Sequence, residues 1–359
     1  MQKIKEALTF DDVLMLPRYS TILPRSTDIS LKLTKKIVLK VPFLSSAMDT
    51  VTESKMAIAI GKEGGIGVVH RNLSIKKQSL EIKKVKNKNL SVGAAVGTNK
   101  EDLDRAKSLM DKGVDLIVID TAHGHSEKVL KILSKLKKIV GNTPVCVGNI
   151  ATGEAAKKLY NSGADIIKVG IGPGSICTTR MVAGIGVPQI SAIMDVKKSL
   201  NKKKIKIISD GGIKFSGDIA KALAAGADAI MMGSIFAGTD ESPGKKYKAG
   251  GKIFKQYRGM GSIGAMSAGS ASRYFQQNHK DKSKFVPEGV EGRVEYKGKV
   301  SNIIYQLQGG LRSSMGYIGA KNLKEINKRA KFIKITKAGF YESMVHSVEV
   351  TQKTINYKL

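Results

Sequence analysis

The chain has 359 residues, 42% of them hydrophobic, and a formal net charge of +31. This length and hydrophobic content allow a large core, and the two cysteines, Cys146 and Cys177, exclude a disulfide-stapled scaffold. The first ten residues lack the apolar segment of a signal peptide, and no uninterrupted apolar run approaches membrane-spanning length. We therefore expect a soluble, cytoplasmic protein.

The positive charge comes from 61 Lys and Arg residues against 30 Asp and Glu residues. A field of this sign attracts anions and could hold nucleic acid without sequence preference. The lysines are scattered, however, and the chain has no Trp and no interleaving of aromatic and basic residues. The pattern favours a lysine-rich solvated surface over a specific nucleic-acid interface.

Short apolar runs recur along the chain with helical patterns between most of them. Three of them, within 111–120, 161–170 and 224–233, follow a glycine and an aspartate two residues later. The glycine is typical of a helix C-cap and the apolar run of a buried parallel strand. The candidate strands are 42–47, 65–70, 90–97, 115–120, 144–149, 165–170, 205–210 and 229–234. Eight such units predict an α/β protein of the (β/α)8, or TIM, barrel type. A doubly wound sheet is disfavoured because no G-x-G-x-x-G follows the first strand.

The barrel rhythm stops after residue 235. Residues 238–312 are rich in Gly, Lys and Ser, which predicts a long insertion after the eighth strand that is mobile over the barrel mouth. A helical segment at 321–332 could complete the outer ring. We expect residues 1–359 to form a single domain.

Active sites of such barrels lie at the carboxyl ends of the strands. Those ends carry small and polar residues here, namely Ser45-Ser46, His70, Asp120, Asn149, the loop around Cys177, Asp210-Gly211-Gly212 and Gly233-Ser234. The glycines after the seventh and eighth strands predict a phosphate site built from backbone N–H groups. Asp210 and Asp120 could each accept hydrogen bonds from a ribose diol, or could cap a turn and a helix. His123 and His125 do not have the spacing of metal ligands, so we expect no transition metal.

The loop "GPGSICTTR" (172–180) places one thiol among glycines and hydroxyls. A free cysteine is most often a small buried hydrophobe, which is our expectation for Cys146. Cys177 differs because its loop is flexible and a helix start or a bound cation there could lower the thiol pKa. We interpret Cys177 as a nucleophile.

Several long motifs, in order, resemble the inosine-5′-monophosphate dehydrogenase / GMP reductase family over essentially the whole chain. They are "LTFDDVLMLP" (8–17), "SSAMDTVTE" (45–53), "GPGSICTTR" (172–180), "VAGIGVPQISAI" (182–193), "DGGI" (210–213), "MMGSIFAGTDESPG" (231–244), "YRGMGS" (257–262), "RYFQ" (273–276), "VPEGVEGRV" (286–294) and "GGLRSSMGY" (309–317). The resemblance implies NAD-dependent oxidation of IMP to XMP in guanine nucleotide biosynthesis.

The resemblance also implies roles for residues. Cys177 would form a covalent thioimidate with the purine. A mobile flap carrying Arg273 and Tyr274 would then enter the space left by the dinucleotide, with Arg273 as the base that activates water and Thr179 helping to position it. Substrate contacts would come from Ser46, Met48, Asn149, Ser175, Asp210, Gly211, Gly212, Gly233, Ser234, Tyr257, Met260, Gly261 and Glu288. NAD would meet Asp120, Thr121, Ala122, His123 and Gly170. A potassium ion would be held by backbone carbonyls of Gly172, Gly174 and Cys177, and by Glu342, Ser343 and Met344 of a neighbouring subunit in a homotetramer.

Three features depart from the family pattern. The pair of regulatory cystathionine-β-synthase-type domains that members usually carry between the second and third strands has no room at about residues 86–91. Met344 stands where a histidine is usual, and Ser272 where an aspartate often precedes the Arg-Tyr pair. We expect no nucleotide regulation through those domains, and changes in cation affinity and flap closure.

Three other functions compete with this one. GMP reductase shares the barrel and the cysteine loop and naturally lacks the regulatory domains, but "RYFQ", "VPEGVEGRV" and "GGLRSSMGY" belong to a flap needed for hydrolysis. A catalytically dead barrel that binds nucleic acid has only the charge in its support, and Cys177, Thr179, Arg273 and Tyr274 argue against it. A flavin-dependent barrel would be coloured when purified.

Overall fold

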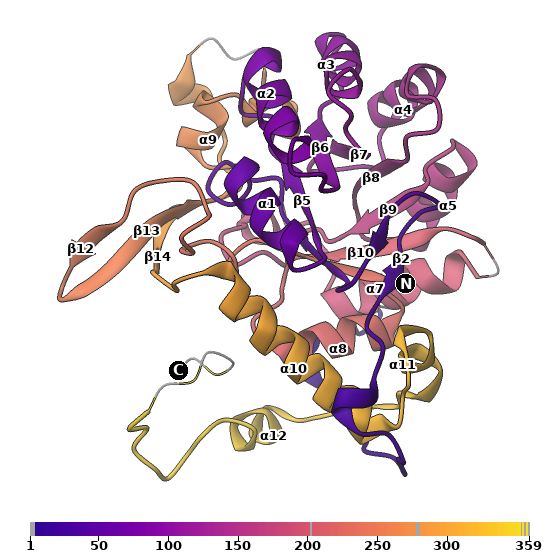
Figure 1. Cartoon of the computed structure of the whole chain (residues 1–359), viewed down its shortest axis with the longest axis vertical. Helices are drawn as coiled ribbons and strands as arrows, with labels where there is room; N and C mark the ends of the chain where they lie inside the picture. The colour runs from indigo at the N-terminus through magenta and orange to yellow at the C-terminus, as the bar shows by residue number, and fades with distance from the viewer. Residues whose placement is uncertain (1–3, 202, 278–280, 353, 355–356, 358–359) are drawn as a thin grey trace.

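A closed barrel of eight parallel strands forms the centre of the computed structural model, which describes residues 4–201, 203–277, 281–352, 354 and 357 (Figure 1). The strands are β4 (Phe43–Ser45), β5 (Ile66–Val69), β6 (Val92–Val96), β7 (Leu116–Asp120), β8 (Val145–Ile150), β9 (Ile166–Val169), β10 (Lys206–Asp210) and β11 (Ala229–Met232). They pair in chain order, and β11 returns to pair with β4. Each falls on one of the eight predicted runs, so the (β/α)8 barrel is confirmed.

Helices cover the outside of the barrel in the same order (Figure 1). They are α1 (Ser54–Lys62), α2 (Ile75–Lys86), α3 (Glu101–Met110), α4 (Glu127–Ile139), α5 (Gly153–Asn161), α7 (Gln189–Ser199), α8 (Ser216–Ala225) and α10 (Val300–Ile318). Residues 87–91 alone join α2 to β6, so the chain passes from the second to the third barrel strand with no regulatory domain pair between them.

The apolar core has two parts. Side chains inside the barrel, such as Leu44, Val68 and Val118, form one cluster, and a small hairpin of β2 (Leu31–Lys32) and β3 (Val38–Leu39) adds its leucines to it. The larger cluster lies between the strands and the helices. The hairpin thus closes one end of the barrel, which leaves the carboxyl ends of the strands for the site.

The recurring Gly-x-Asp pattern has a structural role. Each aspartate directly precedes a strand, accepts a backbone N–H from the preceding strand and pairs with a lysine. The three sets are Asp115 with Val92 (2.9 Å) and Lys86, Asp165 with Val145 (2.7 Å) and Lys137, and Asp228 with Ile207 (2.9 Å) and Lys206. These aspartates fix the strand register at the end of the barrel opposite the site.

The segment after β11 was predicted to be an insertion up to residue 312, but its C-terminal part belongs to a barrel helix. It contains β12 (Tyr247–Ala249), β13 (Lys252–Arg258) and β14 (Glu291–Glu295), which form an antiparallel sheet, together with α9 (Ile263–Ser267), η3 (Ser270–Tyr274) and η4 (Lys282–Lys284). The insertion predicted over 238–312 overlaps α10, which begins at Val300 and packs between α8 and α1. Gly310 explains why this helix contains glycine, because a Cβ there would lie 2.1 Å from the Ser216 Oγ of α8.

The two ends of the described chain meet on one side of the barrel. After η1 (Phe10–Asp12), strand β1 (Val13–Met15) pairs antiparallel with β15 (Phe332–Lys334). The predicted segment 321–332 contains α11 (Leu323–Arg329), which packs on α8 and α10, so α10 and not this segment completes the helical ring. Beyond β15, α12 (Lys337–Glu342) contacts η1, and the Phe340 ring lies under the Lys214 ammonium group. Among the described residues no helix is both long and apolar enough to cross a membrane.

Candidate active site

A cavity of about 150 Å³ lies at the carboxyl ends of the barrel strands. Most of the residues predicted from the sequence line it: Ser46, Met48, Asp120, Asn149, Gly170, Gly172, Gly174, Ser175, Cys177, Asp210, Gly211, Gly212, Gly233, Ser234, Tyr257, Met260, Arg273, Tyr274 and Glu288. Typical ligand pockets have volumes of about 300–1,000 Å³. Two side chains of the insertion, Arg273 and Tyr274, fill part of this space.

The cysteine loop brings the thiol into a short chain of hydrogen bonds. The loop leaves β9, turns through glycines, and places Cys177 two residues before Thr179, where the short helix α6 (Thr179–Val182) begins. The Cys177 Sγ lies 3.2 Å from the Thr179 Oγ1, which donates to the Glu288 Oε2 at 2.7 Å. A proton leaving the sulfur therefore has a path through a hydroxyl to a carboxylate.

Glu288 reaches this position because the insertion binds the cysteine loop through its backbone. The Thr178 N–H donates to the Glu288 carbonyl at 3.0 Å, and the Val290 N–H donates to the Ile176 carbonyl at 3.0 Å. The two segments thus form a local antiparallel bridge between Cys177 and Gly289. Cys146, in contrast, is fully buried in the barrel interior, and this burial raises its pKa to about 12.

The glycines after β10 and β11 form a cradle of backbone donors. Gly211 and Gly212 have φ values of +92° and +82°, which favour glycine. The N–H groups of Gly212, Gly233 and Ser234 donate to no other group among the residues the structure describes. The buried hydroxyl of Tyr257, hydrogen-bonded to Ser175, faces the same space, and burial raises its pKa to about 12. Such a set of neutral donors fits a phosphate.

Lys168 is the site residue that the sequence analysis missed. It lies on β9, its side chain is 2% exposed, and its Nζ donates to the Asp120 Oδ1 (2.9 Å), to the Asp210 Oδ2 (2.8 Å) and to the Asn149 Oδ1. The Asn149 amide also donates to the Asp210 Oδ2 at 3.0 Å. The two aspartates that the sequence predicted for two separate riboses therefore meet at one ammonium group.

Arg273 reaches into the cavity from the insertion. Its guanidinium forms an ion pair with the Asp120 Oδ2, and its carbonyl accepts the Ala122 N–H at 3.1 Å. Burial lowers the pKa of Arg273, an effect that Tyr274 opposes, and burial raises the pKa of Tyr274. Tyr274 packs on Gly261, where a Cβ would lie 2.7 Å from the tyrosine ring. The insertion thus covers the Asp120 side of the cavity.

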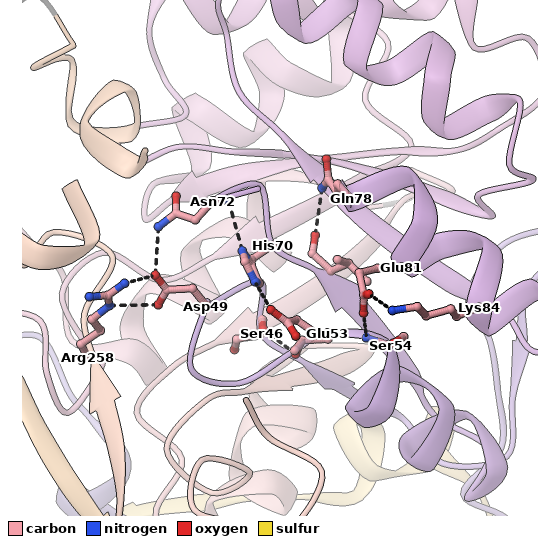
Figure 2. A network of polar contacts seen from close by, with 12 residues as sticks. Ser46, Asp49, Glu53, Ser54, His70, Asn72, Gln78, Glu81, Lys84 and Arg258 are labelled. Atoms are coloured by element: carbon pink, nitrogen blue, oxygen red, sulfur yellow. Dashed lines mark hydrogen bonds and ion pairs between the residues drawn. The ribbon is translucent and has the colours of Figure 1, made fainter. Parts of the chain in front are cut away.

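The insertion is anchored to the loops after β4 and β5 by a polar network (Figure 2). Asp49 binds the Arg258 guanidinium of β13 at 2.6 Å and accepts from the Asn72 amide at 3.0 Å. Beside it, His70 is buried, with its Nδ1 accepting the Asn72 N–H (3.1 Å) and its Nε2 lying 3.4 Å from Glu53 (Figure 2). His70, predicted at a strand end, therefore orients a loop and does not line the cavity.

The remaining predicted residues lie outside the cavity lining. The Thr121 hydroxyl donates to the Gly148 carbonyl at 2.9 Å, and Ala122 contacts the insertion. The ring of His123 lies edge-on to that of His125, with 6.3 Å between the ring centroids. Partial burial and the neighbouring His125 lower the pKa of His123. Gly261 supports Tyr274 as described above. Glu342, Ser343 and Met344 lie at and after the end of α12 and do not line the cavity of their own chain.

The cysteine loop also offers carbonyl oxygens. The carbonyls of Gly172 and Cys177 accept no hydrogen bond from the described residues, and the Gly174 carbonyl accepts only the Cys177 N–H at 3.1 Å. A monovalent cation can be held by such oxygens. Within the described ranges, no group of three or more His, Cys, Asp or Glu residues could hold a metal ion.

Comparison with known proteins gives matches over nearly the whole chain. The family model described as the IMP dehydrogenase / GMP reductase domain matches residues 7–346. The chain is 47% identical to a protein named inosine-5′-monophosphate dehydrogenase from Cryptosporidium parvum, over 99% of both chains. It is 48% identical to the protein of that name from Borreliella burgdorferi, over 96% of this chain and 98% of the other. It is 42% identical to the protein of that name from Aquifex aeolicus, over 99% of this chain and 98% of the other.

Proposed function

The chain belongs to the IMP dehydrogenase / GMP reductase family and is an oxidoreductase, and from this premise we propose that it oxidises IMP to XMP with NAD⁺ in guanine nucleotide biosynthesis. The observation that carries the proposal is the placement of Cys177 in one cavity with the glycine cradle and Asp210. That arrangement suits a nucleotide whose phosphate, ribose and base lie along the carboxyl ends of the strands.

IMP binds with its phosphate on the donors of Ser175, Gly211, Gly212, Gly233, Ser234 and Tyr257. Asp210 accepts the ribose hydroxyls through its Oδ1, because its Oδ2 is held by Lys168 and Asn149. Ser46 and Met48 line the same pocket, and Met260, Gly261 and Glu288 bind the base. This pose brings C2 of the hypoxanthine to the Cys177 Sγ.

NAD⁺ supplies the acceptor for the hydride that leaves C2. Asp120 fits a ribose of the dinucleotide, with Gly170, Thr121, Ala122 and His123 nearby. Arg273 occupies the Asp120 Oδ2 in this structure. We infer that the dinucleotide and the Arg273 side chain bind Asp120 in turn.

The Cys177 thiol gives up its proton through Thr179 towards Glu288, and the thiolate formed attacks C2. Loss of the hydride leaves a thioimidate between sulfur and C2. Water then adds to C2, with Arg273 taking its proton and Thr179 orienting it, and the C–S bond breaks to release XMP. Tyr274 packs beside Arg273 and helps to exclude bulk water.

The free carbonyls of the cysteine loop support a potassium site at Gly172, Gly174 and Cys177. Glu342, Ser343 and Met344 complete that site from a neighbouring chain, in a cytoplasmic homotetramer. Potassium would hold the loop so that Cys177 faces the base.

The test is absorbance at the NADH band with purified protein, IMP, NAD⁺ and K⁺, run beside Cys177→Ala. We expect NADH formation in the unmodified protein and a loss of at least about 1,000-fold in the variant. A parallel cuvette holds GMP and NADPH. Consumption of NADPH there, without NADH formation from IMP, would contradict the proposal and favour GMP reductase.

A further inference from the structure

Two of the ligand-binding carboxylates of the proposed reaction share one buried cation. Lys168 is the only charged side chain of β9, and it lies among apolar neighbours with 2% of its surface exposed. A buried ammonium group is stable only when its charge and its N–H groups are matched. In the proposed chemistry above, Lys168 only occupies the Asp210 Oδ2, and no step of the reaction explains its charge.

The geometry accounts for all of its donors. An ammonium group has three N–H bonds, and Lys168 has three acceptors: Asp120, Asp210 and Asn149. Lys168 therefore has no donor left for a ligand and no lone pair with which to act as a base or nucleophile. It can act only through the groups that it holds.

The same contacts leave a defined oxygen of each carboxylate for a ligand. Lys168 holds the Oδ1 of Asp120 and the Oδ2 of Asp210. The Asp210 Oδ1 accepts no hydrogen bond from the described residues, and the Asp120 Oδ2 is bound by Arg273. When Arg273 leaves, Lys168 still fixes the orientation of Asp120 and presents its Oδ2.

Charge leads to the same conclusion. With Arg273 in place, two cations face two anions, and the cluster is neutral. Without Arg273, Lys168 is the one cation left between two carboxylates that each lie within 2.9 Å of its Nζ. Like charges repel in a buried site, so the two carboxylates would lose their shared partner and move apart if Lys168 were absent.

We propose that Lys168 is a positioning residue that aligns Asp120 for the dinucleotide and Asp210 for the nucleotide, and that holds both carboxylates in place while Arg273 moves in and out. This inference rests on the proposed function, because it assigns the two carboxylates to two ligands. It predicts that one substitution on β9 weakens the binding of both substrates.

The test compares Lys168→Met, which removes the charge, with Lys168→Arg, which keeps it. Steady-state kinetics give kcat and the two KM values, and calorimetry gives the Kd for IMP in a Cys177→Ala background. We expect Lys168→Met to raise the KM for NAD⁺ and the Kd for IMP by about 100-fold each, and Lys168→Arg to restore both to within about fivefold. Lys86→Met is the matched control, since Lys86 pairs with Asp115 at the other end of the barrel, and it should change neither constant.

A second variant separates misfolding from misplacement. Lys168→Met combined with Asp120→Asn removes one cation and one anion, which restores charge balance. Compared with Asp120→Asn alone, the double variant should have a KM for NAD⁺ less than about twofold higher, and it should still bind IMP more weakly. Folded Lys168→Met with unchanged KM and Kd would overturn the inference, as would Lys168→Arg as impaired as Lys168→Met. Failure of the unmodified protein to form NADH would instead reject the proposed function, and the IMP calorimetry would still test Lys168 through Asp210.

Discussion

At the residue scale, the two cysteines show how environment decides what a thiol can do. Cys146 faces the barrel interior and has no exposed surface, whereas Cys177 is half-buried at the cavity. Only the thiolate reacts with electrophiles, so the fraction of thiolate and its accessibility set the rate of labelling. The sequence separated these residues correctly, because an apolar run and a glycine loop are different environments.

We therefore expect iodoacetamide at pH 8 to label Cys177 alone in the native protein. With a pKa of about 12, Cys146 is a thiolate in only about 1 molecule in 10,000 at that pH, and in about 1 in 1,000 at pH 9. Peptide mapping by mass spectrometry should find one label per chain, and two after denaturation. IMP should protect Cys177. Native labelling of Cys146 at a comparable rate would contradict this.

Lys168 was not predicted, for a physical reason. In "DIIKVG" a lysine interrupts an apolar strand, and sequence alone does not show whether it faces solvent or a buried acceptor. Its acceptors come from β7, β8 and β10, the nearest of them 19 residues away in sequence. A short-range pattern cannot reveal contacts of this kind. The one signal in the sequence was a lysine within the short apolar strand β9, where a charge needs a buried partner.

At the element scale, the barrel could be predicted and the end of the insertion could not. The strands produce apolar runs that stand out locally. In α10 the apolar positions Val300, Ile304, Leu307, Leu311 and Met315 follow a helical period, but Gly309, Gly310, Ser313 and Ser314 obscure it. Close packing on α8 requires the small residue at 310, and that requirement is visible only in three dimensions.

The η3 element, which carries Arg273, is held to the barrel by a hydrogen bond that can be strengthened. The Arg71 guanidinium donates to the Ser272 hydroxyl at 2.8 Å, and burial lowers the pKa of Arg71. A carboxylate in place of the hydroxyl would turn this hydrogen bond into an ion pair, a gain of about 1 kcal/mol. That gain favours the arrangement in which Arg273 occupies Asp120.

We therefore expect Ser272→Asp to raise the KM for NAD⁺ about fivefold, because the dinucleotide must displace a more stable flap. The KM for IMP should stay within about twofold of the unmodified value, since Asp210 does not contact Arg273. Initial-rate kinetics at varied NAD⁺ and saturating IMP measure this. Ser272→Ala is the control and should shift the KM for NAD⁺ in the opposite direction; an equal rise in both variants would refute the explanation.

At the scale of the whole molecule, the C-terminal segment has the features of a surface that another chain covers. It follows β15 (Figure 1), and four apolar side chains between 341 and 348 are solvent-exposed, with Val348 at 69% and Tyr341 at 56%. Exposed apolar residues gathered on one extended segment favour burial in an assembly. Its acidic and carbonyl groups at 342–344 would then be available to a neighbour's cysteine loop.

We expect light scattering on a sizing column to give about four times the chain mass of 38.6 kDa. Deletion of residues 337–359 leaves the β1–β15 pairing in place, and it should reduce the assembly and abolish activation by K⁺. A monomeric unmodified protein would contradict the prediction, and so would full K⁺ activation after the deletion.

Met344→His tests how this segment reaches the cation. If the backbone carbonyl at 344 is the ligand, the side chain has no direct contact, and the K⁺ concentration for half-maximal activation should change by less than about threefold. Lys337→Ala, on the same segment but outside residues 342–344, is the matched control and should leave this K⁺ concentration unchanged. A large change in Met344→His alone would mean that the side chain at 344 takes part in the site. A large change in both variants would mean that the conformation of the whole segment sets the K⁺ affinity. A cation held by backbone carbonyls responds to the path of the chain and not to the identity of one side chain.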